Sequence, residues 1–155
     1  MKMKSTLRVV NQGGVKKRPG IVKGQVLQPL VGVPEFPSER VRAAVATFKP
    51  GVHELLHWHP IEVFYYVIAG GAIVRDYYGK QYKVGPGSSI YAPAGIAGSH
   101  EWEVGKDGLQ LLSVRATRAG HRRMQFTVDR KTKRSYIELH ELEAMDATDF
   151  ESHYD

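Results

Sequence analysis

Two histidines separated by a single residue are the first feature of this sequence that could do chemistry. They are His57 and His59 in the stretch HWHPIEVFYY, which continues as a run of apolar and aromatic residues. On a β-strand, side chains two positions apart point to the same face, about 6–7 Å apart along the strand. Two imidazoles placed in this way can bind one metal ion, although a bare pair at a strand end is also typical of surface histidines.

Glycine and proline residues surround this pair in a definite order. Gly51 lies six residues before His57, and the strand predicted after the pair ends at Gly70. A second pattern follows, formed by Gly85, Gly87, Pro93, Gly95 and then His100. In this order and separation the two patterns resemble the two sequence motifs of the cupin superfamily, over about residues 40 to 116.

The resemblance implies both a fold and a metal site. Cupins fold as an all-β double-stranded β-helix, a jelly-roll barrel. They bind a divalent metal inside it, with two histidines and a glutamate from the first motif and a histidine from the second. This chain is similar in size and motif layout to the cupin dioxygenases that have three-histidine sites. On this resemblance, the metal ligands are His57, His59 and His100.

The glutamate of the first motif has no direct counterpart. Counting back from Gly70, its position falls on Val63, and Glu62 is the neighbouring acid. On a regular strand the Glu62 carboxylate would point away from the metal, whereas a bulge or irregular turn after Pro60 could rotate it inward. We therefore predict Glu62 as a catalytic residue at the rim of the site, with metal coordination as the alternative.

The third histidine is displaced as well. The family pattern places it at position 98, which is Gly98 here, and His100 follows two residues later. Glycine-rich turns accept insertions at small entropic cost. A longer turn would therefore bring His100 to the start of the next strand, where the family's histidine lies.

Three neutral imidazoles leave the full charge on a divalent ion. Imidazole suits iron, zinc, copper and nickel, and ligands on one side with open positions opposite suit non-haem Fe(II). We expect Fe(II), with Mn, Ni and Zn as alternatives, and an anionic chelating substrate such as an enolate, a β-diketonate or a 2-oxo acid. The predicted function is therefore an Fe(II) dioxygenase that acts on a small oxygen-containing substrate.

Two other functions stay open. A metal-dependent isomerase, lyase or cyclase would stabilise an enolate without O₂ while a tyrosine or histidine moves the proton. A non-catalytic barrel that binds a small ligand is the other alternative, and the apolar Val63 favours it. Because one barrel hosts many chemistries, the fold does not choose among them.

Several polar residues are candidates for the pocket. Tyr65 shares strand parity with Val63, so it would point inward as a catalytic residue, with core packing as the alternative. An arginine directed into the barrel at Arg40 or Arg42 would pair with a substrate carboxylate, although both could be exposed. Further candidates are Trp102, Gln110 and Arg115.

The elements that must position these residues are short strands. Apolar runs alternate with glycine- and proline-rich turns, which is typical of an all-β sandwich or barrel. The predicted strands cover 21–28, 41–48, 53–58, 63–68, 72–77, 80–84, 88–92, 99–104 and 109–115.

The domain organisation follows from this pattern. We expect one domain over 1–155, with a barrel core at about 40–116, an N-terminal strand at about 20–28 and a C-terminal extension over 117–155. The spacing of Leu139, Leu142 and Met145 predicts a short amphipathic helix or an interface tail. Because barrel edges can pair, we expect a homodimer or a higher homo-oligomer.

Composition narrows the function further. The chain has 155 residues, no cysteine and a net charge of +6. The absence of cysteine excludes disulfides, thiolate metal sites and thiol nucleophiles. The basic clusters lack a nucleic-acid motif, so we expect solvated loops or attraction of an anionic substrate rather than a nucleic-acid partner. No signal peptide or membrane span is apparent, which predicts a cytoplasmic protein without a membrane partner.

Overall fold

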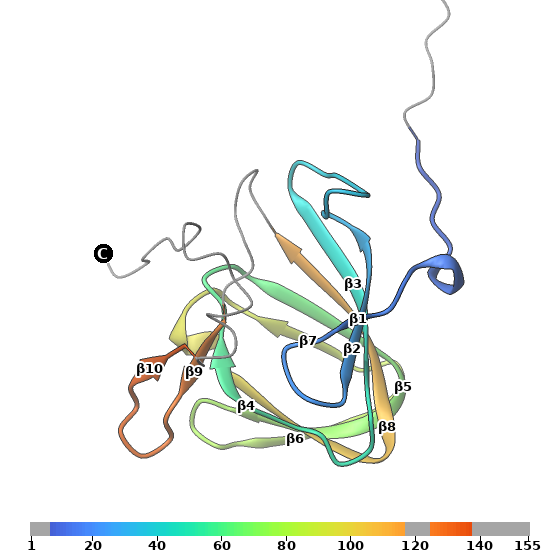
Figure 1. The fold of residues 1–155 in the computed structure, drawn as a ribbon. Helices are drawn as coiled ribbons and strands as arrows, with labels where there is room; N and C mark the ends of the chain where they lie inside the picture. Colours follow the sequence, from blue (N-terminus) through green and yellow to red (C-terminus); the bar gives the residue numbers. More distant parts are fainter. Residues whose placement is uncertain (1–6, 117–124, 138–155) are drawn as a thin grey trace, which may run out of the picture.

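The computed structural model describes residues 7–116 and 125–137, and this part of the chain is built from β-strands (Figure 1). The elements in chain order are η1 (Gln12–Gly14), β1 (Arg18–Pro19), β2 (Gln25–Val31), β3 (Val41–Phe48), β4 (His53–Trp58), β5 (Val63–Asp76), β6 (Gln81–Val84), β7 (Ser89–Ala92), η2 (Ile96–Gly98), β8 (His100–Ala116), β9 (Phe126–Val128) and β10 (Ser135–Tyr136). The all-β prediction is confirmed.

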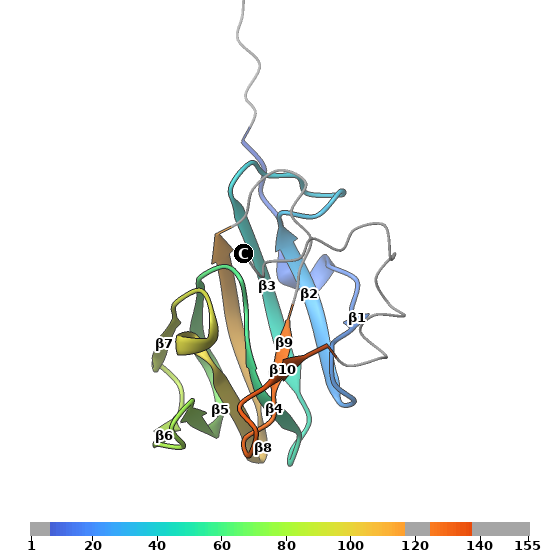
Figure 2. The same cartoon turned by 90° about the vertical axis from the view of Figure 1, so that its left-hand side faces the viewer.

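The strands form one curled antiparallel sheet. Its main path runs β1-β2-β3-β8-β4-β9-β10, and β5 pairs with β6, β7 and β8. Figure 1 shows the strands curling around a common interior, and Figure 2 shows β1 to β3 on one side and β5 to β7 on the other. Strand β2 overlaps the N-terminal strand predicted at 21–28 but begins four residues later, and it extends the sheet by pairing with β3.

Two pairs of predicted strands are single long strands in the structure. The prediction of separate strands at 63–68 and 72–77 is wrong because β5 runs through Gly70 without a turn. The same holds for 99–104 and 109–115, which β8 joins. Gly70 has a φ of 73°, and a Cβ there would lie 2.1 Å from the Gly108 carbonyl oxygen. Gly70 and Gly108 therefore permit a close approach of the two backbones and a bulge inside a continuous ladder.

Side chains along β5 alternate between the barrel interior and the solvent. Val63, Tyr65 and Val67 are buried, whereas Phe64 and Tyr66 are exposed. The buried set belongs to the main core, together with residues of β3, β6 and β8. The period-two pattern expected for a strand with one buried face therefore holds here.

A second apolar cluster covers the other face of β4. Leu56 and Trp58 pack there with Phe126 and Val128 of β9, and the Trp58 and Phe126 rings stack with centroids 4.3 Å apart. Strand β4 is therefore covered on its outer face by this cluster. Its inward side chains Glu54 and His57 are buried on the other face.

The predicted C-terminal helix or tail with Leu139, Leu142 and Met145 lies outside the described residues. Just before it, Ser135 and Tyr136 form β10, which pairs with β9. No helix in the described ranges is long and apolar enough to cross a membrane.

Candidate metal centre

A bulge in β4 positions His57. Glu54 is opposite Trp102 and His57 is opposite His100, so three residues of β4 span two residues of β8. The extra residue turns Glu54 and His57 to the same side, although their odd spacing would separate them on a regular strand. Both side chains are buried, at 5% and 1% exposure.

A tight turn positions the other two histidines. The His59 carbonyl accepts a hydrogen bond from the Gly95 N–H at 2.8 Å. The turn continues through η2 to His100, the first residue of β8. A Cβ at Gly98 would lie 1.9 Å from the Pro93 carbonyl oxygen, so glycine is needed for this compact turn. The longer turn predicted before His100 is thus observed.

The three histidines converge inside the barrel. One nitrogen from each of His57, His59 and His100 lies within 4.8 Å of the others. The ring centroids of His57 and His100 are 4.4 Å apart, and those of His57 and His59 are 5.1 Å apart. All three side chains are buried. The structure therefore contains a three-histidine site whose geometry could hold a metal ion.

Backbone carbonyls orient two of the rings. His57 Nδ1 lies 2.7 Å from the Leu55 carbonyl oxygen, and His100 Nδ1 lies 2.8 Å from that of Gly98. A carbonyl oxygen can only accept, so each Nδ1 carries the proton and each Nε2 keeps a lone pair in the neutral ring. Metal-ligating histidines typically have this type of supporting hydrogen bond.

Burial keeps His100 uncharged. Loss of solvation, followed by the electrostatic effect of the neighbouring His57, lowers the pKa of His100 from 6.5 to about 3. A divalent ion needs neutral imidazole donors, so the protonation state and the tautomers both fit a metal. The histidines are therefore in the chemical state that metal binding requires.

The Tyr65 side chain points toward the three-histidine site. Its hydroxyl lies 3.0 Å from His100 Nε2 and 3.5 Å from His59 Nε2. Because His100 Nε2 carries the lone pair, the hydroxyl donates to it. The inward orientation expected from strand parity is observed, and the hydroxyl lies beside the nitrogen that would bind a metal.

The structure places Glu62 elsewhere. Its side chain is exposed, and its Oε2 accepts a hydrogen bond from the Tyr91 hydroxyl at 2.7 Å. Val63, in the position of the family's glutamate, is 1% exposed. Residues after Pro60 do not rotate Glu62 inward, and it is not a member of the three-histidine group.

Glu54 is the acid that sequence reasoning missed. Its Oε1 lies 3.8 Å from His57 Nε2 and accepts a hydrogen bond from Gln125 Nε2 at 3.3 Å. The only sequence signal is a lone acid inside the apolar strand HELLHW. Strand parity would have placed it on the face opposite His57, and the bulge reverses this.

The other pocket candidates divide between surface and interior. Arg40 is exposed, and Gln110 donates a hydrogen bond to Thr47 Oγ1 at 3.2 Å. Trp102 is 1% exposed and contacts the Tyr65 ring edge-to-face. Arg42 and Arg115 line a cavity inside the barrel together with Trp102 and Tyr65.

Comparison with known proteins agrees with this geometry. Residues 44–114 match the family described as the cupin domain. The chain belongs to the cupin superfamily. No curated protein matches its sequence. The predicted cupin barrel is therefore confirmed, whereas the reaction has to be inferred from the site itself.

Several solved structures share the fold. The polyketide cyclase RemF from Streptomyces resistomycificus is 22% identical with a TM-score of 0.62, covering 72% of this cupin and 80% of RemF. An RmlC-like cupin from Shewanella frigidimarina NCIMB 400 is 18% identical with a TM-score of 0.59, covering 74% and 94%. Oxalate decarboxylase from Bacillus subtilis is 26% identical with a TM-score of 0.58, covering 75% of this cupin. This cupin spans 31% of the length of that decarboxylase.

Replacing Glu54 by glutamine is expected to weaken metal binding by about 10–100-fold, the range seen when groups supporting metal ligands are changed. The substitution keeps the size and removes a negative charge beside His57 Nε2. Competition with a metal-sensitive dye measures the affinity. Glu103→Gln, which alters a half-exposed acid paired with Arg75, is the control and should not change it. Equal affinities for the two variants would contradict a role of the Glu54 charge.

Acid is expected to destabilise the metal-free protein through His100. Its folded-state pKa of about 3 lies below the reference value of 6.5, so the unfolded chain binds the proton between these values. The free energy of unfolding therefore falls as the pH decreases from about 6.5 toward about 3, by roughly 1 kcal/mol per pH unit. Urea unfolding at pH 7 and pH 5 measures this. A fall that is as large in His100→Gln would show that other groups cause it.

Proposed function

We propose that this cupin is a metal-dependent enzyme in which His57, His59 and His100 hold a divalent ion. The observation that carries the proposal is the convergence of three buried imidazole nitrogens within 4.8 Å of one another. Hydrogen bonds from Nδ1 keep a lone pair on Nε2 of both His57 and His100. The Tyr65 hydroxyl, which donates to His100 Nε2, would give way to a bound ion. Because the imidazole donors are uncharged, an ion held there would attract a small chelating oxygen substrate with negative charge.

A divalent ion supplies Lewis acidity toward oxygen ligands and, as Fe(II), reactivity toward O₂. We propose Fe(II), with Mn, Ni and Zn as alternatives, and a dioxygenase as the leading activity. Imidazole ligands that leave open coordination positions support this choice. The protein contributes an enclosed pocket, in which Trp102 holds the Tyr65 ring edge-to-face at 5.2 Å between centroids.

An isomerase, lyase or cyclase that does not use O₂ is the second candidate. The Tyr65 hydroxyl, 3.0 Å from His100 Nε2, is a buried group that could move a proton within the site. The names of two similar structures, a polyketide cyclase and an oxalate decarboxylase, also point to chemistry of this type. Tyr65 would then act as the general acid or base.

Metal content is the first test. Elemental mass spectrometry of the purified protein is expected to show about one divalent ion per chain. Oxygen uptake by the iron-loaded protein with β-diketones and 2-oxo acids then tests the dioxygenase, and turnover under strict anaerobiosis would select the second candidate. A protein that takes up no added ion would overturn both enzymes and favour a non-catalytic ligand-binding barrel. The cytoplasmic location and the homo-oligomer stay predictions from the sequence.

Replacing Tyr65 by phenylalanine is expected to lower turnover by about 10²–10⁴-fold if the hydroxyl moves a proton. Metal content should not change, because the three histidines remain. Tyr66→Phe is the matched control, since this neighbouring side chain is 43% exposed on the other face of β5. Unchanged turnover in Tyr65→Phe would assign Tyr65 to packing.

A further inference from the structure

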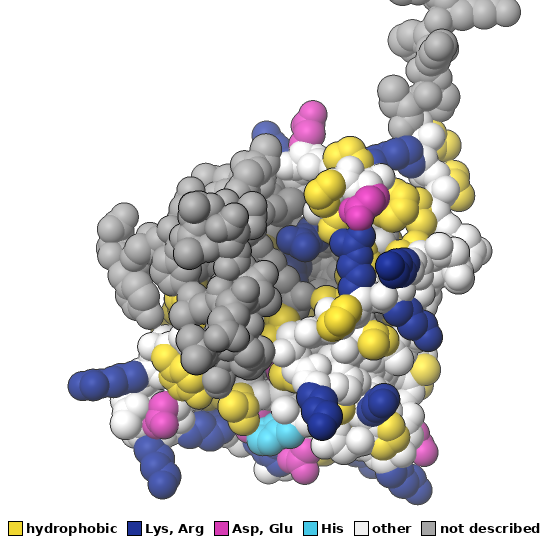
Figure 3. Space-filling view, in the orientation of Figure 1, with side chains coloured by type: hydrophobic (Ala, Val, Ile, Leu, Met, Phe, Trp, Pro, Cys, Tyr) yellow, Lys and Arg dark blue, Asp and Glu magenta, His cyan; other side chains and the backbone are white. Residues whose placement is uncertain are grey.

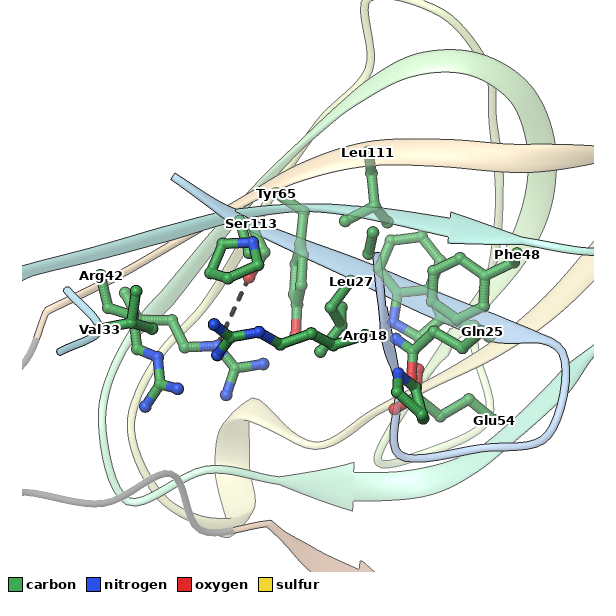
Figure 4. A pocket seen from close by; sticks show the side chains of 16 residues that line it. Arg18, Gln25, Leu27, Val33, Arg42, Phe48, Glu54, Tyr65, Leu111 and Ser113 are labelled. Carbon is green, nitrogen blue, oxygen red and sulfur yellow. Dashed lines mark hydrogen bonds between the residues drawn. The ribbon is translucent and has the colours of Figure 1, made fainter. Parts of the chain in front are cut away.

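A cavity of about 130 Å³ lies inside the barrel beside the three-histidine site. Among the described residues it is lined by three arginines, Arg18, Arg42 and Arg115, and by one acid, Glu54. Figure 4 shows Arg42 at one end, Glu54 at the other and Tyr65 between them. Figure 3 shows a hollow on this side of the molecule with basic side chains in and around it. Positive charge is therefore concentrated at one end of the cavity.

One nitrogen of the Arg115 guanidinium, Nη1, lacks an acceptor among the described residues. Its side chain is buried, at 7% exposure. Its Nε donates to Ser113 Oγ at 3.4 Å, while Nη1 has no hydrogen-bond partner among the described residues. Leaving a guanidinium N–H buried without a partner is costly, so this group calls for an acceptor that the described residues do not supply.

Arg42 adds a second positive charge at the same point. Arg42 on β3 and Arg115 on β8 are opposite each other in the ladder, an arrangement that is destabilising for like charges. Burial, and after it the charges of Arg115 and Arg18, lower the pKa of Arg42. Arg18 already pairs with Glu35, which does not line the cavity. Arg42 and Arg115 are therefore the pair that an anion would neutralise.

We propose that Arg42 and Arg115 bind the carboxylate of a small organic acid, which extends from them toward Tyr65 and the histidines. The planar guanidinium group binds a carboxylate through two parallel hydrogen bonds. An engineered cavity of about 150 Å³ holds benzene, so this cavity suits a molecule with about as many heavy atoms, such as a short 2-oxo acid. The assignment rests on the proposed function and deepens it by naming the substrate class.

Calorimetric titration of the metal-free protein with pyruvate tests the arginine pair alone, because no ion is present to bind the probe. We expect millimolar binding, at least tenfold weaker binding in Arg115→Gln and Arg42→Gln, and equally weak binding of the neutral amide, pyruvamide. Arg40→Gln is the matched control, since Arg40 is exposed and does not line the cavity. If Arg115→Gln does not fold, the half-buried Arg42 provides the same comparison.

Three results would overturn the assignment: equal binding of pyruvate and pyruvamide, unchanged binding in both arginine variants, or tighter binding of inorganic phosphate than of pyruvate. Because the titration uses the metal-free protein, its result does not depend on whether the histidines bind an ion. Arginine-dependent pyruvate binding by a protein that takes up no ion would sustain the carboxylate site and reject the enzyme. Metal uptake without arginine-dependent pyruvate binding would sustain the metal site and reject the carboxylate site.

Discussion

Replacing His57 by alanine is expected to reduce bound metal from about one ion per chain to below about one tenth of an ion. The His57 ring is close to both other rings, with centroid distances of 4.4 Å to His100 and 5.1 Å to His59. Its removal would leave two imidazoles and an open cavity in place of a converging set. Elemental mass spectrometry after dialysis measures the ratio of metal to protein.

Thermal unfolding gives a second readout of the same change. At a metal concentration about 100-fold above Kd, binding to the folded state adds about 2.7 kcal/mol of stability, which His57→Ala should lose. His53→Ala is the control, because His53 is on the same strand but its side chain is half-exposed and pairs with Glu101 at 3.2 Å. A His57→Ala protein that still holds about one ion would reject the three-histidine site.

Replacing Trp102 by alanine is expected to lower the free energy of unfolding by about 3–5 kcal/mol. Trp102 is among the largest fully buried side chains and is 1% exposed. It contacts the Tyr65 ring edge-to-face and forms part of the cavity wall. The loss corresponds to a fall in Tm of about 6–20 °C for a domain of this size. Denaturant titration and calorimetry measure the two quantities.

An exposed aromatic residue provides the comparison for Trp102. Tyr78 is 89% exposed, so Tyr78→Ala should change stability by less than about 0.5 kcal/mol. Metal content should be retained in Trp102→Ala, because the three histidines remain. A loss below about 1 kcal/mol would mean that the interior collapses around the missing indole.

The extent of the barrel could be predicted from local sequence. Alternating burial along Val63 to Ile68 and the turn residues between strands are local properties, so they identify a sheet with one enclosed face. The motif spacing also picks out the three histidines that the structure brings together. Prediction failed where glycine was interpreted as a turn, because Gly70 and Gly108 instead allow two long paired strands to approach closely.

The sequence by itself therefore determined the all-β class, the inward face of β5 and the histidines of the candidate metal site. Only the tertiary structure decided which charges surround them. Glu54 faces His57 because a bulge in β4 is set by its pairing with β8. Arg42 meets Arg115 because β3 and β8, far apart in the sequence, pair in that register. Register and bulges depend on partner strands, so no local pattern specifies them.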